Sequence, residues 1–104
     1  MQVTPQTPTE IDIATAPAFL AEICEAIDWA DNRAVVIDCS AITYMDSSAF
    51  HALIEAHDYA IGHDHVLVIR GLAESCLRVV RICDRGSERI DFGEFRSARR
   101  DLEP

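Results

Sequence analysis

Short runs of apolar and β-branched residues recur along the chain, and their length is typical of β-strands rather than helices. The runs read EIDI, AVVIDC, VLVIR and RIDF, at residues 10–13, 34–39, 66–70 and 89–92. The run at 34–39 is almost continuously apolar, which predicts a central strand covered on both faces. The pattern as a whole predicts about four strands.

Between these runs, apolar residues recur every three or four positions, which is the spacing of one helix face. The expected helices span about residues 15–30, 49–61 and 73–84, with a shorter amphipathic turn at 95–102. Thr15 as N-cap and Pro17 in the first turn favour the first helix start, and Gly62 favours the end of the second helix. This alternation predicts an α/β fold, with one mixed or mostly parallel sheet of about four strands and three to four helices.

The chain is long enough for a single domain, because 104 residues supply one hydrophobic core and no second one. Residues 1–9 hold two prolines and three threonines, which predicts a flexible lead-in before a domain over 10–104. No apolar run approaches the ~18 residues of a membrane span. The first ten residues have neither the basic region nor the apolar stretch of a targeting peptide. We therefore expect a cytoplasmic protein.

The charge of the chain is acidic and unevenly distributed. The net charge is −9, which repels nucleic acid and anionic lipid surfaces and favours protein partners with a basic face. Residues 1–65 hold one basic residue, Arg33, against 11 acidic ones, whereas residues 66–104 hold 8 arginines against 7 acids. An acidic face is expected to steer such a partner if the first part of the chain gathers on one side.

The segment with the most specific chemistry places Asp46, Ser47 and Ser48 at the start of the second predicted helix, after a buried strand and a short loop. All three residue types favour helix N-caps, so a structural cap is one explanation of them. A phosphate on such a serine is tolerated by the fold, because helix N-termini offer unpaired N–H groups and a positive dipole end. The same dianion beside Asp46 alters any docked surface.

The stretch VVIDCSAITYMDSSAF resembles the phosphorylation segment of the STAS domain family, the bacterial anti-anti-sigma factors. EIDIATAPAF and VLVIRGLAESCLRVVRICDRG resemble the family's first helix region and its third strand and helix unit. The resemblance implies an anti-sigma factor antagonist, a cytoplasmic phosphoprotein that regulates sigma-factor-dependent transcription in stress responses. Its implied partner is an anti-sigma factor serine kinase, and the domain itself is expected to be a binding module with no enzyme activity.

Carried onto this chain, the resemblance implies phosphorylation of Ser47, with Ser48 as second choice. It also implies that Asp46, Ser47, Ser48 and Ala49 contact the partner. Ala49 stands where the family has a glycine, and its methyl group is expected to meet the partner's chain. The family has further strands before residue 10, so in this chain the N-terminal strands are expected to be shortened or missing. The exposed sheet edge that results favours homodimerisation.

Two other functions stay open at this point. One is a STAS-like structural or scaffold subunit that is never phosphorylated and acts through homo- or hetero-oligomerisation. The other is a thiol redox sensor built on Cys76 and Cys83, which lie on one face of the third predicted helix. Neither the cysteines nor the histidines show metal-ligand spacing, and no phosphate-cradling or nucleophile motif is present, so we expect no metal, cofactor or catalytic residue.

Overall fold

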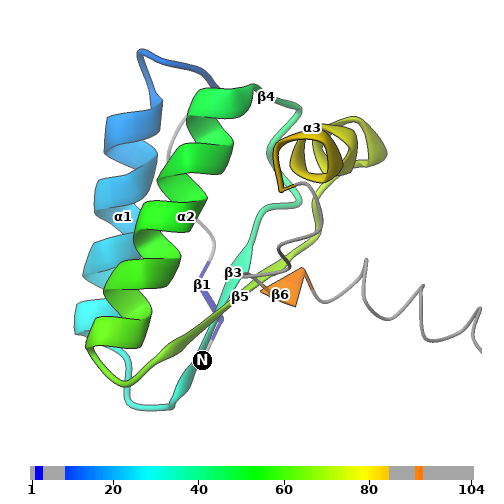
Figure 1. The fold of residues 1–104 in the computed structure, drawn as a ribbon. Helices are drawn as coiled ribbons and strands as arrows, with labels where there is room; N and C mark the ends of the chain where they lie inside the picture. Colours follow the sequence, from blue (N-terminus) through cyan, green and yellow to red (C-terminus); the bar gives the residue numbers. More distant parts are fainter. Residues whose placement is uncertain (1, 4–8, 85–90, 93–104) are drawn as a thin grey trace, which may run out of the picture.

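Strands and helices alternate along the chain in the computed structural model, which describes residues 2–3, 9–84 and 91–92 (Figure 1). The strands are β1 (Gln2–Val3), β2 (Glu10–Ile11), β3 (Ala34–Asp38), β4 (Tyr44–Met45), β5 (Val66–Arg70) and β6 (Asp91–Phe92). The helices are α1 (Ala16–Asp28), α2 (Ser47–Gly62) and α3 (Glu74–Asp84). The α/β class expected from the sequence is confirmed.

The main sheet has the strand order β1-β3-β5-β6, and each of its pairings is parallel. Its centre is the β3–β5 pair, which runs in register from Ala34 opposite Val66 to Asp38 opposite Arg70. A second, two-stranded parallel sheet joins β2 to β4. Among the described residues, the sheet expected to be mixed or mostly parallel is parallel in every pairing, because a helix connects its successive strands.

The two longer helices, α1 and α2, lie side by side against one face of the main sheet and run in the same direction (Figure 1). The paired side chains Val35 and Leu67, and Ile37 and Ile69, point into this layer and are almost fully buried. Val36 on the opposite face is only half-buried. The expected burial of the central strand on both faces is therefore complete on one face only.

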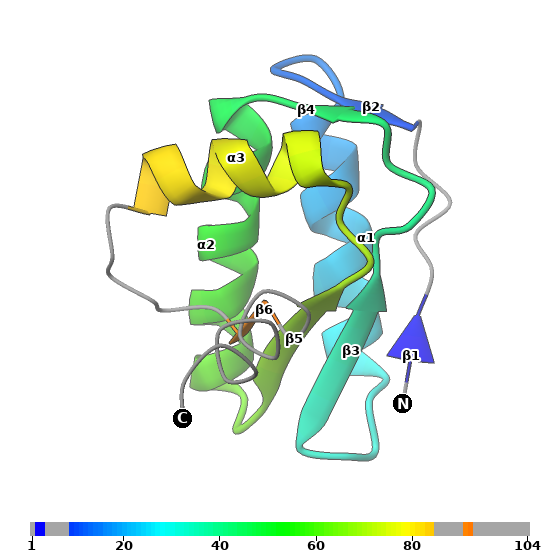
Figure 2. The ribbon, with the colours of Figure 1, turned by 90° about the vertical axis from the view of Figure 1, so that its right-hand side faces the viewer.

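The third helix runs across α2 and also contacts β4 (Figure 2). Val80 and Cys76 face the core, as the helical spacing predicted, and Cys76 is 0% exposed. Leu77 and Cys83 are half-buried beside them. This helix therefore closes the end of the molecule at which the strands finish.

The N-terminus differs from the expected lead-in, because Gln2 and Val3 form β1 and pair with Val36 and Ile37. A strand is therefore present before residue 10, and it is short, as expected. In the last predicted strand, β6 confirms residues 91–92, whereas residues 89–90 and the turn expected at 95–102 lie outside the described residues.

Candidate functional site

Helix α2 begins at Ser47 because Asp46 caps it. Asp46 has extended backbone angles, with φ −115 and ψ −168, and its Oδ1 accepts a hydrogen bond from the Ser48 N–H at 2.8 Å. The Asp46 carbonyl oxygen accepts bonds from the N–H groups of Ala49 and Phe50. Among the three residues that favour the N-cap, the structure thus assigns that position to Asp46 and places both serines in the first turn.

The segment before α2 is held in place by the β2–β4 pair. Ile11 lies opposite Met45 in this parallel ladder, and both side chains are buried. The Asp46 N–H donates to the Ile11 carbonyl oxygen at 3.2 Å, and the Thr43 N–H donates to that of Thr9 at 2.8 Å. The start of α2 is therefore fixed to the segment that leads into α1.

The loop that starts α1 is organised by Asp12 rather than by Thr15. Asp12 Oδ1 accepts from the N–H groups of Ala14 at 2.9 Å and Thr15 at 3.1 Å. The Thr15 hydroxyl accepts from the Asp12 N–H and donates to the Glu10 carbonyl oxygen, so it makes no capping bond to the helix. The prediction of a hydroxyl cap by Thr15 was wrong, although Thr15 does occupy the N-cap position.

The hydrogen bonds to Asp12 also set its charge. The backbone N–H of Thr15 makes the largest contribution and that of Ala14 the next, and together they hold the pKa of Asp12 below its usual value. Asp12 is therefore ionised at neutral pH. Asp12 directly follows Ile11, whose carbonyl oxygen accepts the hydrogen bond from the Asp46 N–H, so the backbones of the two aspartates lie near each other.

Ser47 is the exposed residue of the Asp-Ser-Ser segment, whereas Asp46 and Ser48 are half-buried. Its hydroxyl makes no hydrogen bond within the described part of the chain. A hydroxyl that is exposed, unbonded and located in the first turn of a helix is accessible to an enzyme that modifies it. A negative group added there also meets the positive end of the helix dipole.

Ala49 lies on the inner side of α2 and is 0% exposed. Its methyl group packs in the core, since the first turn directs every third to fourth side chain inward. This position corrects the expectation that Ala49 contacts a partner. The substitution of the family's glycine by Ala49 therefore leaves the outer surface unchanged.

Two exposed apolar side chains beside Ser47 were not predicted from the sequence. Ile13, in the loop before α1, is 80% exposed, and Tyr44, on β4, is 50% exposed. Both flank the point where Asp46 is hydrogen-bonded to Ile11. We call the surface formed by Ile13, Tyr44, Asp46 and Ser47 the docking end. The alternation in EIDI places Ile13 on the same face as Ile11, which is buried, so no signal in the sequence indicated the exposure of Ile13.

The cysteines are free thiols, and the structure separates them by burial. Burial, followed by the charges of Asp38 and Cys76, raises the pKa of Cys39 to about 12. Burial also raises the pKa of Cys76, which argues against a reactive thiolate there. The electrostatic neighbours of Cys39 are Asp38 and, on α3, Cys76.

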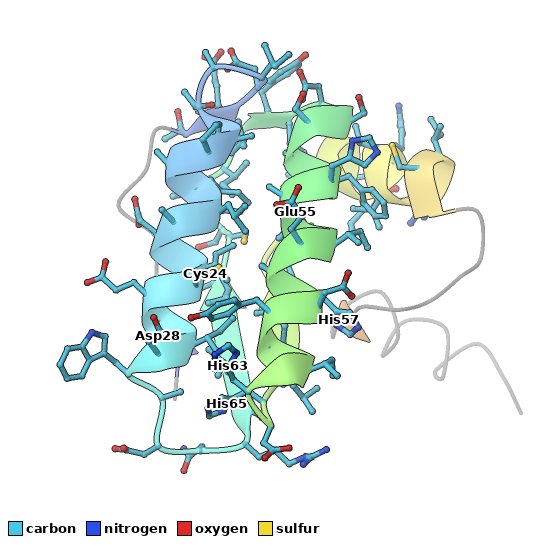
Figure 3. All side chains as sticks on the ribbon, turned by 60° about the vertical axis from the view of Figure 1, so that its left-hand side comes forward. Cys24, Asp28, Glu55, His57, His63 and His65 are labelled. Carbon is cyan, nitrogen blue, oxygen red and sulfur yellow. The ribbon has the colours of Figure 1, made fainter. Side chains whose placement is uncertain are left out.

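The histidines do not gather into a metal centre. Within residues 2–3, 9–84 and 91–92, no group of three or more His, Cys, Asp or Glu side chains could hold a metal ion. His57 points away from the seam between α1 and α2, along which His63 and His65 lie (Figure 3). The buried Nδ1 of His57 has no hydrogen-bond partner in the described part of the structure.

The family of the chain follows from a comparison with protein-family models. The model of the STAS domain matches residues 6–100, which is nearly the whole chain. The chain belongs to the STAS domain family. The match covers both the start of α2 and the loop before α1, so the docking end is part of the STAS domain.

The STAS family includes anti-sigma factor antagonists, and membership indicates a function in protein–protein interaction. No curated protein matches the chain. Among the described residues, the helices are all too short or too polar to cross a membrane.

Proposed function

We propose that this STAS domain is an anti-sigma factor antagonist whose docking end is switched by phosphorylation of Ser47. The observation that carries the proposal is the position of Ser47, which is exposed in the first turn of a helix whose start is fixed by Asp46 and Ile11. Unmodified, the domain sequesters an anti-sigma factor kinase and so frees a sigma factor for transcription under stress.

The apolar side chains of the docking end suit a protein partner. Ile13 and Tyr44 together offer an exposed aliphatic and an exposed aromatic group, the kinds of side chain that anchor interfaces when buried by a partner. Asp46 and Asp12 add negative charge beside them, which favours a partner with a basic face. Ser48 is the second-choice acceptor, because it is half-buried whereas Ser47 is exposed.

Phosphorylation would end docking through desolvation. The partner kinase transfers the terminal phosphoryl group of ATP to the Ser47 Oγ, a base of the kinase takes the hydroxyl proton, and ADP leaves. The added phosphate carries about −1.5 to −2 charges at neutral pH. Burying such a group beside Ile13 and Tyr44 costs several kcal/mol, and about 3 kcal/mol already corresponds to a loss of about 100-fold in affinity.

The fold itself would tolerate the phosphate. Ser47 lies outside the core, and the dipole of the 16-residue helix α2 has its positive end there. The modification is therefore expected to change binding without unfolding the domain.

The test is mass spectrometry of the protein purified from its own cells with phosphatases inhibited. We expect a phosphate on Ser47 that persists in Ser48→Ala and is absent from Ser47→Ala. In affinity capture from the same cells, the wild type and Ser47→Ala should retain an anti-sigma factor that Ser47→Asp does not retain. Equal capture by Ser47→Asp would contradict the switch.

A second function is favoured by the edge of the main sheet. β1 pairs only with Val36 and Ile37, so within the described residues Ala34 and Val35 lack a strand partner on that side. An unpaired edge supports assembly as a structural subunit or as a homodimer. Light scattering coupled to size-exclusion chromatography discriminates the two functions, because a monomer at all accessible concentrations argues against assembly.

A further inference from the structure

The end of the molecule opposite Ser47, where α1 and α2 both finish, exposes an unpartnered aromatic surface. Trp29 is the C-cap of α1 and is 74% exposed. It is also the single tryptophan of the chain. Exposure of so large a ring is unusual for a surface without a partner, because tryptophan is among the residues most often buried in interfaces.

The charge around Trp29 is negative. Glu25, Asp28 and Asp31 are all exposed and lie within four residues of it in the chain. The last turns of α1 and α2 contain no basic residue, and one exposed arginine, Arg33, follows α1, so three carboxylates face a single basic side chain near Trp29. Because α1 and α2 run in the same direction, both negative ends meet at this end of the molecule (Figure 1).

One of these carboxylates is held in position by an aromatic pair at the end of α2, formed by Tyr59 and the C-cap residue His63. The Tyr59 hydroxyl donates a hydrogen bond to Asp28 Oδ1, and this bond raises the pKa of Tyr59. The His63 ring stacks on Tyr59 with ring centroids 4.2 Å apart. Asp28 and His63 lie along the seam between the two helices (Figure 3). The carboxylate is therefore fixed relative to two aromatic rings.

The His63 ring is itself fixed by the backbone. Its Nδ1 lies 2.8 Å from the Tyr59 carbonyl oxygen. A carbonyl oxygen only accepts hydrogen bonds, so Nδ1 carries the proton and donates it. Asp28, Tyr59 and His63 are thus linked by hydrogen bonding and ring stacking, and Asp28 directly precedes Trp29 in the chain.

We propose that this surface, which we call the Trp29 end, binds an arginine-bearing segment of a second protein. A guanidinium group stacks on an exposed indole and at the same time donates two parallel hydrogen bonds to a carboxylate. Trp29 supplies the ring, Asp28 supplies a positioned carboxylate, and Glu25 and Asp31 supply the surrounding negative field.

A second copy of this chain is the less suitable occupant. The chain carries a net charge of −9, so two copies repel each other. Among the described residues, the exposed arginines are Arg33, Arg70, Arg78 and Arg81, and Arg81 is paired with Glu74 of the same helix at 3.1 Å. The net repulsion between two copies therefore favours a different protein as the source of the arginine.

The Trp29 end should function independently of Ser47. The 16 residues of α2 separate the two ends by about 24 Å at 1.5 Å per residue. This exceeds the screening length of about 8 Å at physiological ionic strength. A phosphate on Ser47 would therefore leave binding at Trp29 unchanged, and the domain could hold one partner while releasing another.

The test uses a capped peptide that contains three arginines and one leucine, with a control peptide in which glutamates replace the arginines. Binding is followed by the emission of Trp29 and by amide chemical shifts in NMR. We expect a saturable shift of the emission to shorter wavelength with the arginine peptide alone. The shifted amides should cluster at residues 25–33 and 59–65 and leave those around Ser47 unchanged.

Matched variants identify the residues responsible. Asp28→Asn keeps a hydrogen-bond acceptor for Tyr59 and should lower the affinity for the arginine peptide about fivefold. Glu10→Gln makes the same change of charge at the other end of the molecule and should leave this affinity unchanged. Trp29→Ala, whose binding is measured by NMR, should lower the affinity for the arginine peptide further. Ser47→Asp should bind this peptide like the wild type. Equal binding by Trp29→Ala, or shifts spread over every acidic residue, would overturn the proposal. An emission shift caused by protein concentration alone would overturn it in favour of a second copy.

Discussion

Replacement of Asp46 by alanine tests the framework on which the docking end is built. The substitution removes the carboxylate that accepts the 2.8 Å hydrogen bond from the Ser48 N–H, and it leaves that donor without its cap. Loss of an N-cap of this kind costs about 1 kcal/mol, within a range of about 0.5–2 kcal/mol. The half-buried position of Asp46 limits the access of water that could replace the bond.

The loss is measurable by urea unfolding monitored by circular dichroism. With a slope of about 1–3 kcal/mol per molar urea, 1 kcal/mol lowers the midpoint by about 0.3–1 M. In a thermal scan, the same loss lowers Tm by about 4–8 °C for a domain of this size. Asp46→Asn is the matched control, because it keeps a capping oxygen and removes only the charge.

Ser47→Ala provides the second control, and it should change the free energy of unfolding by less than about 0.5 kcal/mol because Ser47 is exposed. The reasoning fails if Asp46→Ala is as stable as the wild type. It also fails if Asp46→Asn loses as much as Asp46→Ala, because charge and not capping would then be the source of the stabilisation.

Gly71→Ala should lower the free energy of unfolding by about 2–4 kcal/mol, because Gly71 has φ +82 and a Cβ there would lie 2.9 Å from the Ser40 nitrogen; an unchanged urea midpoint would refute this close approach. Asp12 should make the stability of the domain depend on pH, because its pKa is lower in the folded state than in the unfolded state. Its contribution to the free energy of unfolding is present above the unfolded pKa of about 4 and is lost as the pH falls through the folded value. The difference in urea midpoint between the wild type and Asp12→Asn should therefore be larger at about pH 6 than at about pH 3, and a constant difference would argue against backbone hydrogen bonding as the cause of the lowered pKa. Cys39, with a pKa of about 12, should resist iodoacetamide at about pH 8 until the protein is unfolded, and peptide mass spectrometry that finds it alkylated in the native state would contradict its burial.

The parts of the fold that could be predicted from the sequence are those specified by local patterns. AVVIDC and VLVIR correctly predicted β3 and β5 because their apolar, β-branched runs are dense and have the length of a strand. The start of α2 was predicted at about residue 49 and lies at Ser47, two residues earlier, because the Asp-Ser-Ser segment offers three possible caps and the structure uses the first. Local hydrogen bonding and burial were sufficient in both cases.

The parts that could not be predicted depend on contacts between distant segments. β1 has only two residues, and it is a strand because β3 offers an edge to Gln2 and Val3. The buried thiol of Cys39, just after β3, is an electrostatic neighbour of Cys76 on α3, a relation that the spacing of Cys76 and Cys83 on one helix does not indicate. The exposure of Trp29 could likewise not be predicted from the sequence, because it depends on where α1 ends relative to the elements packed around it.

The start of α1 shows a third reason. Asp12 and Thr15 each bring a side chain that can bond to nearby N–H groups, and the sequence alone does not decide between them. In the structure Asp12 takes the two N–H groups and Thr15 turns back to Glu10. In the loop before α1, Asp12 and Thr15 therefore both form hydrogen bonds to the backbone, but Asp12 and not Thr15 binds the N–H groups at the helix start.

The common direction of α1 and α2 gives the molecule a permanent electrical axis. In an antiparallel helix pair the two dipoles oppose each other, but in this fold they add, and each helix contributes about half a positive charge at the end that holds Ser47. Two such helices give about one positive charge there, and a phosphate of about −1.5 to −2 charges more than cancels it. Phosphorylation of Ser47 would thus outweigh the positive potential that the two helices create at that end. A charged partner several ångströms away would then be oriented toward a different side of the molecule before any contact is made.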